Sequence, residues 1–188
     1  GDKEYNLAKA EKFLDKAGKQ GVQVACFFDR FNTHHVGRID DVRKYAEPIP
    51  GPTINRLAKK AKEYSMYICS GSTDEVLDGK YYNTSTLIGP KGEIIGKYHK
   101  VHLTRGYEQQ YFTAGNDFPV YKTDVGVLAM YIQHDGDYCE VPRILGLKGA
   151  EIMLHPGSTG VKWASAHISI PQRQMQAYDA NAFMINCN

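Results

Sequence analysis

Apolar residues recur along this chain at two spacings, one typical of helices and the other of buried strands. The helical spacing is clearest near the start, where Leu7, Ala10, Leu14 and Ala17 alternate with lysines and acidic residues. An amphipathic helix on the surface of a globular domain has this pattern. The same spacing, together with Thr53 as an expected N-cap, predicts helices over residues 5–19, 53–64, 140–150 and 169–179.

Short runs rich in β-branched and aromatic residues predict the strands. A hairpin is expected within residues 74–103, because Gly-Pro-Lys-Gly at 89–92 is a strong turn signal between two apolar runs. The chain alternates strands, helices and hairpins, and this order predicts a single α/β domain over residues 1–188. The other strands are predicted over residues 22–28, 66–73, 120–132, 150–156 and 182–188.

The composition of the chain excludes some classes of partner and location but does not change the predicted fold. The 23 basic and 21 acidic residues give a net charge of +2, so no nucleic-acid partner is expected. No apolar run approaches the roughly 20 residues of a membrane helix, and the first residues are charged, which is unlike a signal peptide. The four cysteines are scattered without a Cys-x-x-Cys pair. We therefore expect reduced thiols, a cytoplasmic location and no membrane association.

Polar residues stand where several predicted strands end. Asp29 follows the run 22–28, Lys100 ends the second arm of the hairpin, and Gln133 ends the run 127–132 just before a polar turn and a helix. Glu108 lies eight residues after Lys100. The ends of parallel strands form the clefts of α/β sheets, so these groups are expected to converge. Taken singly, each residue also fits a turn, a cap or a solvated surface position.

Two long segments, residues 49–103 and 140–157, resemble the carbon-nitrogen hydrolase family of nitrilases and aliphatic amidases. The most specific parts are GKYHKVHL at 96–103 and ILGLKGAEI at 144–152, and the resemblance covers essentially the whole chain. It implies a four-layer α-β-β-α sandwich that hydrolyses nitriles, amides or carbamoyl amines without a metal or an organic cofactor. Members of the family are longer, so the chain is expected to lack strands at both its N- and C-terminal ends.

The resemblance also implies the roles of four residues. In the family a Glu removes the proton of a Cys nucleophile, a Lys stabilises the charge that develops on the substrate, and a second Glu lies close by. The Lys falls on Lys100, and the second Glu falls on Glu108 in an E-x-x-x-F-x-x-G pattern. Asp29 replaces the first Glu, which shortens the carboxylate's reach by on the order of 1.5 Å. Gln133 replaces the Cys, and a neutral amide cannot form a thioester, so weak or no hydrolysis by this route is expected.

Three alternatives follow from these departures. Cys139, six positions after Gln133 at the start of a helix, could be a relocated nucleophile with a lowered pKa. A water activated by Asp29 or Glu108 could replace the thiol. The chain could also be a non-catalytic binding or structural protein. A metal site is not expected: His99, His102, His134 and Asp135 offer suitable ligands, but strand alternation points His99 away from Lys100.

Residues beside these strand ends are expected to line a cleft for a small amide, nitrile or carboxylate. His134, Asp135 and Tyr138 flank Gln133, while His155 and Trp163 follow the next strand. For Trp163, a role as a partly buried loop anchor is an equal alternative. The resemblance further implies that the helix after the strand-to-helix turn at Gln133 (the elbow), within residues 139–150, forms a homo-oligomer contact together with the last helix.

Overall fold

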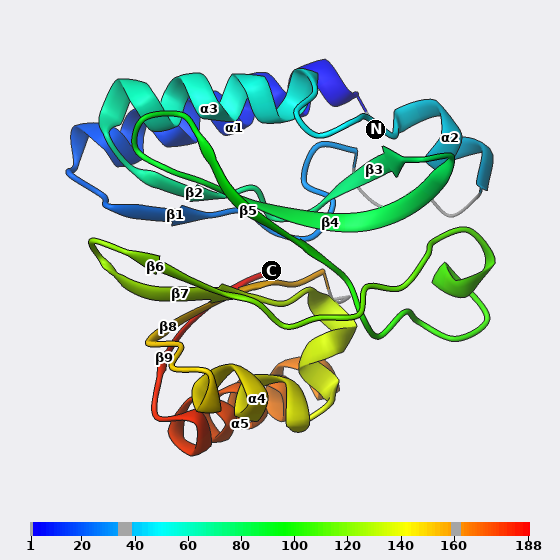
Figure 1. Ribbon diagram of the computed structural model, residues 1–188, viewed down its shortest axis with the longest axis vertical. Coiled ribbons are helices and arrows are strands. Elements are labelled where there is room, and N and C mark those ends of the chain that lie inside the picture. The colour runs from blue at the N-terminus through cyan, green and yellow to red at the C-terminus, as the bar shows by residue number, and fades with distance from the viewer. Residues whose placement is uncertain (1, 34–38, 159–162) are drawn as a thin grey trace.

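Two β-sheets stack face to face, and helices cover the outer face of each (Figure 1). The computed structural model describes residues 2–33, 39–158 and 163–188, with the backbone alone for residues 39 and 163–167. The layers run α-β-β-α, which confirms the sandwich implied by the resemblance. No helix in these ranges is long and apolar enough to cross a membrane. The helices are α1 (Lys3–Lys19), α2 (Ile39–Tyr45), α3 (Pro52–Tyr64), α4 (Glu140–Leu147) and α5 (Trp163–Ala180).

The first sheet lies beneath α1 and α3. Its strand order is β1-β2-β4-β3, and β5 also pairs with β4. The β1–β2 pair is parallel and the other pairs are antiparallel. The chain enters this sheet from α1, whose apolar stripe faces inward as its periodicity predicts. The strands are β1 (Val24–Cys26), β2 (Tyr67–Cys69), β3 (Thr73–Leu77), β4 (Lys80–Ile88) and β5 (Ile94–His99).

The second sheet lies on α4 and α5. Its order is β6-β7-β8-β9, with an antiparallel β6–β7 pair followed by parallel pairs. The expected single strand over residues 120–132 is wrong, because the chain turns back at Asp124 and Val125. Gly126 completes the turn at φ 119°, a conformation open to glycine. The strands are β6 (Val120–Thr123), β7 (Gly126–Met130), β8 (Ile152–Pro156) and β9 (Phe183–Cys187).

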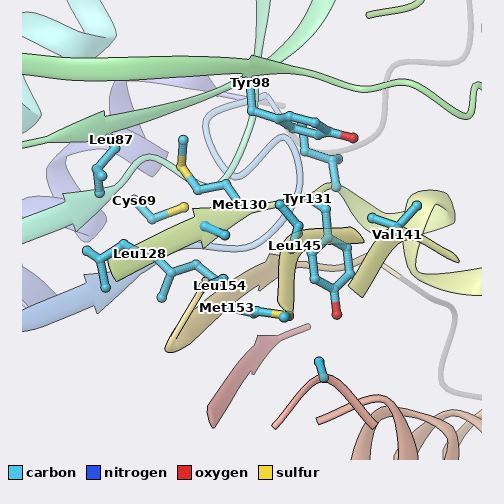
Figure 2. Close-up of a cluster of buried hydrophobic side chains, with 14 of the residues drawn as sticks. Cys69, Leu87, Tyr98, Leu128, Met130, Tyr131, Val141, Leu145, Met153 and Leu154 are labelled. Carbon is cyan, nitrogen blue, oxygen red and sulfur yellow. The ribbon is translucent and has the colours of Figure 1, made fainter. Parts of the chain in front are cut away.

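The main hydrophobic core fills the space between the sheets and continues down to α4. Figure 2 shows Leu87 and Tyr98 of the first sheet facing Leu128 and Met130 of the second. These four side chains are almost fully buried, and burial of this kind contributes on the order of 2 kcal/mol for each large apolar side chain. A second cluster fills the space between α1, α3 and the outer face of the first sheet. The two clusters fix how the strand ends meet.

Several local expectations differ from the structure. Thr53 is not the N-cap of α3, since Gly51 takes that place. The Thr53 N–H and hydroxyl instead donate to the Glu47 carboxylate at 2.8 and 3.0 Å. Neither α2 nor the turn between β3 and β4 was predicted from the sequence. Asp78 and Gly79 form this turn, and both have positive φ. Helix α5 starts at Trp163, earlier than residue 169.

Candidate active site

Gln133 stands on a sharp turn between β7 and α4. It opens a 3-10 turn, Gln133–Asp137, with φ 42°, a left-handed conformation that costs a non-glycine residue roughly 1 kcal/mol. The buried Asp135 holds this turn, because its carboxylate accepts the N–H groups of Ile132 at 3.1 Å and His102 at 2.7 Å. The elbow of the second sheet is thereby tied to the chain that leaves the first sheet.

Lys100 comes directly after β5 and is almost completely buried. Its backbone N–H donates to the carbonyl of Asn83 at 2.9 Å, which fixes the start of the side chain. Its ammonium donates to Glu108 Oε2 at 2.7 Å and to Gln133 Oε1 at 2.6 Å. One buried cation thus joins the Glu108 carboxylate to the side chain of Gln133 at the elbow.

Glu108 lies in a short 3-10 turn, Glu108–Gln110. Its Oε2 also accepts the N–H of Thr104 at 2.9 Å. Burial acts to raise the pKa of Glu108, but the charge of Lys100 and the hydrogen bonds from Lys100 and Thr104 outweigh it and hold this pKa below its ordinary value. Glu108 is therefore ionised at neutral pH and forms a buried ion pair with Lys100.

Asp29 follows β1 and is also buried. Its Oδ1 accepts from the Ser72 hydroxyl at 2.5 Å and from Asn83 Nδ2 at 3.2 Å. The same Asn83 nitrogen lies 3.5 Å from Glu108 Oε1, so one amide group stands between the two carboxylates. Ser72 and Asn83 were not predicted from the sequence, since a lone Ser or Asn in a strand carries no signal of its partner.

A second buried ion pair adjoins Asp29. Arg30 has φ 53° and donates to Asp74 through Nε at 2.8 Å and Nη2 at 2.9 Å. Its guanidinium also lies over the Phe112 ring, 5.0 Å from the centroid. Burial acts to lower the pKa of Arg30, but Asp74 outweighs this and raises it. The pair anchors the Asp29 turn to β3 and to the segment that carries Glu108.

The family model for carbon-nitrogen hydrolases matches residues 1–188. The chain belongs to the carbon-nitrogen hydrolase family. Among curated relatives, the omega-amidase NIT2 of Xenopus tropicalis is 30% identical over 179 residues, and human omega-amidase NIT2 is 29% identical over 192 residues. The alignments cover 91% and 96% of this chain, but the chain spans only 64% and 69% of the length of those two proteins.

Solved structures agree on the fold. Saccharomyces cerevisiae Nit3, of the nitrilase superfamily, superposes with a TM-score of 0.89 at 24% identity, over 100% of this chain and 70% of that one. A cysteine-to-alanine mutant of the amidase from Nesterenkonia sp. AN1, in complex with butyramide, gives 0.87 at 22% identity, over 100% and 71%. At these identities the superpositions show a shared nitrilase-type sandwich.

In this carbon-nitrogen hydrolase domain, the three residues predicted at strand ends lie together with Glu108. Lys100 contacts Glu108 and Gln133, and Asn83 connects Glu108 to Asp29. The three residues predicted to flank Gln133, namely His134, Asp135 and Tyr138, make different contacts. Both Asp135 oxygens are engaged, one of them with Tyr98 Oη at 2.7 Å, so Asp135 holds the elbow from within. Tyr138 stacks on His102 with ring centroids 3.9 Å apart, and His134 Nδ1 lies 2.9 Å from Asp137.

His155 supports the backbone of the elbow. Its Nε2 lies 3.1 Å from the carbonyl oxygen of Gln133, and its Nδ1 lies 2.6 Å from Asn186 Oδ1. Burial, reinforced by the charge of Arg173, lowers the pKa of His155 to about 4. The ring is therefore neutral at pH 7 and carries one N–H. Because the Gln133 carbonyl can only accept, Nε2 carries that N–H, and Nδ1 then accepts a hydrogen bond from the Asn186 amide with its oxygen and nitrogen exchanged. The side chain of Trp163 lies outside the described residues.

The remaining candidates lie apart from Lys100. His99 Nε2 contacts Glu75 at 2.9 Å, on the other side of β5, as strand alternation predicts. Cys139 is exposed, and its thiol contacts Glu140 at 3.5 Å. It lines a surface groove with Pro142, Arg143, Gln176 and Asp179. None of Asp29, Lys100, Glu108 and Gln133 lines this groove. No group of three or more His, Cys, Asp or Glu side chains within the described ranges is arranged to bind a metal ion.

Proposed function

We propose that this carbon-nitrogen hydrolase domain retains a site for a small amide or carboxylate but has weak or no hydrolytic activity by the thioester route. The observation that carries this proposal is the contact at the elbow, where Gln133 Oε1 lies 2.6 Å from Lys100 Nζ. The thioester route needs a thiolate at the residue that reaches Lys100. A carboxamide there is neutral, and its nitrogen is delocalised into the carbonyl group.

The rest of the site supplies charge stabilisation and binding. A buried ammonium such as Lys100 stabilises negative charge on a carbonyl oxygen far better than water does. Glu108 is ionised and holds Lys100, while Asp29 is held by Ser72 and Asn83. As an Asp it reaches about 1.5 Å less far than a Glu, enough to misplace a general base.

The proposed ligand class rests on the relatives and on the polar groups of the site. The omega-amidases share about 30% identity with this chain, and the Nesterenkonia structure contains butyramide. A cation beside two carboxylates offers both a donor for an amide oxygen and acceptors for an amide N–H. We therefore propose a small amide as the first candidate, and a nitrile or carboxylate as the other members of the class.

Release of ammonia from short amides and nitriles tests this proposal. The chain as it stands should give no turnover, whereas the double variant Gln133→Cys, Asp29→Glu should give some. Gln133→Ser, Asp29→Glu is the matched control, because a hydroxyl is a much weaker nucleophile than a thiolate at neutral pH. Turnover by the unmodified chain at the level of the double variant would contradict the proposal.

A second candidate function is hydrolysis by a water held between the two carboxylates. It is favoured by one observation: Asn83 Nδ2 lies within 3.5 Å of both Asp29 Oδ1 and Glu108 Oε1, so the two potential bases lie close to one another. In that case the unmodified chain would release ammonia and Asp29→Asn would abolish the release. A non-catalytic binding or structural role predicts no release from either protein.

Self-association through α4 and α5 is a further part of the proposal. Large apolar side chains are exposed there, among them Leu147 at 74% and Tyr178 at 79%, and such exposure is common at protein contacts. Light scattering after size exclusion should show a dimer or larger species, and Leu147→Glu, Tyr178→Glu should dissociate it. A clean monomer at micromolar concentration would count against this surface. We also propose a reducing, cytoplasmic setting, in keeping with four free cysteines.

A further inference from the structure

The side chain of Gln133 has the covalent outline of an acylated cysteine. In a thioester the atoms run Cβ, Sγ and a carbonyl carbon that carries oxygen and a substituent. In Gln133 they run Cβ, Cγ and Cδ, which carries Oε1 and Nε2. The two differ in one linking atom. If a cysteine stood at residue 133, its acyl oxygen would thus lie near the observed Oε1.

Gln133 Oε1 lies beside the buried ammonium group of Lys100. Lys100 Nζ lies 2.6 Å from Gln133 Oε1, a short distance typical of a hydrogen bond from a charged donor. The Lys100 side chain is 0% exposed, and its other described contact is Glu108 at 2.7 Å. An external carbonyl group that took the same position on Lys100 would have to displace Oε1.

The backbone beneath this contact is fixed. Asp135 accepts the N–H of Ile132, and the neutral His155 lies 3.1 Å from the Gln133 carbonyl oxygen. The residue keeps φ 42° despite the cost of that conformation. The fold therefore sets the position of the Cβ atom of residue 133. The length of the side chain at this residue then decides which of its atoms contacts Lys100 Nζ.

We propose that Gln133 acts as an internal ligand, whose own primary carboxamide occupies the acyl position of the site on Lys100. The inference rests on the proposed function, because it takes the elbow residue as the replaced nucleophile. It also narrows the ligand class to a short aliphatic primary amide. The amide site is thus retained but filled by the chain's own carboxamide, and an external amide takes this position only when the side chain of residue 133 is shortened.

The chain defines its own matched probes. Gln133→Ala removes a group equivalent to acetamide, and Gln133→Gly removes one equivalent to propionamide. Glycine also adopts φ 42° without strain, so this variant is expected to fold. Acetate has the shape of acetamide but adds a negative charge beside Glu108 and Asp29, so we expect it to bind more weakly than acetamide.

Calorimetry with acetamide, propionamide and acetate, with ammonia release followed in the same samples, tests the proposal. The alanine variant should bind acetamide, and the glycine variant propionamide, with a Kd of roughly a millimolar. The unmodified chain, Gln133→Met and the exposed Gln109→Ala should bind at least about tenfold more weakly. Methionine fills the space without offering an amide, and Gln109→Ala controls for loss of a glutamine elsewhere.

Equal affinity of the unmodified chain and of Gln133→Ala or Gln133→Gly for these amides would overturn the proposal that Gln133 is an internal ligand. A lack of amide binding by these two variants, when they are folded, would also overturn it. Preference for acetate over acetamide would overturn the assigned ligand class. Ammonia release by the unmodified chain would instead overturn the proposed function, so the two failures are distinguishable. A structure of the alanine variant with acetamide should place the acetamide oxygen on Lys100 Nζ.

Discussion

The two halves of the site differ in charge. The first sheet and its loops contribute Asp29, Lys100 and Glu108, with a second buried pair, Arg30 and Asp74, behind them. The second sheet contributes Gln133 and His155, which are both neutral at pH 7. Under the proposed function, the charged half binds the ligand and stabilises charge, whereas the neutral half shapes the elbow and presents the Gln133 carboxamide. Under this proposal, a carbon-nitrogen hydrolase scaffold keeps its electrostatic machinery while the residue that meets the substrate changes.

The largest expected effect on this difference between the two halves comes from removing the cation of the charged half, Lys100. Lys100→Met leaves Glu108 buried without its partner, and loss of one member of a buried pair costs about 3–5 kcal/mol. We expect a loss of that size in the free energy of unfolding, measured by urea denaturation. The exposed Lys91→Met should change it by less than about 0.5 kcal/mol. A cost for Lys100→Met no larger than this control would show that the buried pair contributes little.

The neutral half should respond to acid through His155. The pKa of this group is about 4 in the folded chain and near 6.5 when unfolded. The unfolded state therefore binds a proton at higher pH, and stability falls as pH drops from about 6.5 towards 4. Between pH 7 and 4.5 the expected loss is about 2–3 kcal/mol.

The matched variant is His155→Gln, which keeps a donor for the Gln133 carbonyl but does not titrate. Urea denaturation should show this part of the pH dependence in the unmodified chain and not in the variant. Glu108 acts in a lower window: its lowered pKa stabilises the fold above its unfolded pKa, and this contribution is lost as pH falls through the folded pKa. Identical pH profiles for the chain and His155→Gln would contradict the neutral, buried histidine.

A smaller effect is expected at the bridge between the carboxylates. Asn83→Ala removes the donor that serves Asp29 and lies near Glu108, and loss of a buried partner costs about 1–3 kcal/mol. The free energy of unfolding should fall by that amount, less than for Lys100→Met. The control is Asn55→Ala, an exposed residue in α3. Equal effects of the two variants would show that Asn83 does not join the charged groups.

The smallest effect should come from Cys139. Its exposed thiol contacts only Glu140 among the described contacts, so Cys139→Ser should change stability by less than about 0.5 kcal/mol. Alkylation with mass mapping should find that Cys139 reacts no faster than a thiol in an unfolded peptide. Faster alkylation, or ammonia release by the unmodified chain that is lost in Cys139→Ser, would revive the relocated nucleophile.

Periodicity predicted most elements because it is a local property. The stripe in α1 and the buried run of β7 follow directly from residue spacing. The expected long strand over residues 120–132 is wrong because β6 and β7 are separated by only two residues, so the two strands appear in the sequence as one continuous run. The break depends on the conformation of Gly126. Thr53 failed as an N-cap because Glu47, six residues earlier, supplies the carboxylate.

The sequence by itself determined most of the elements, the family resemblance and the identity of the polar residues at strand ends. Only the tertiary structure decided their partners: Asn83 between two carboxylates, Arg30 on Asp74, His155 beneath the elbow, and Lys100 on Gln133. These contacts join residues 22 to 54 positions apart. Such pairings depend on how the two sheets stack, and packing of the core between them sets that geometry.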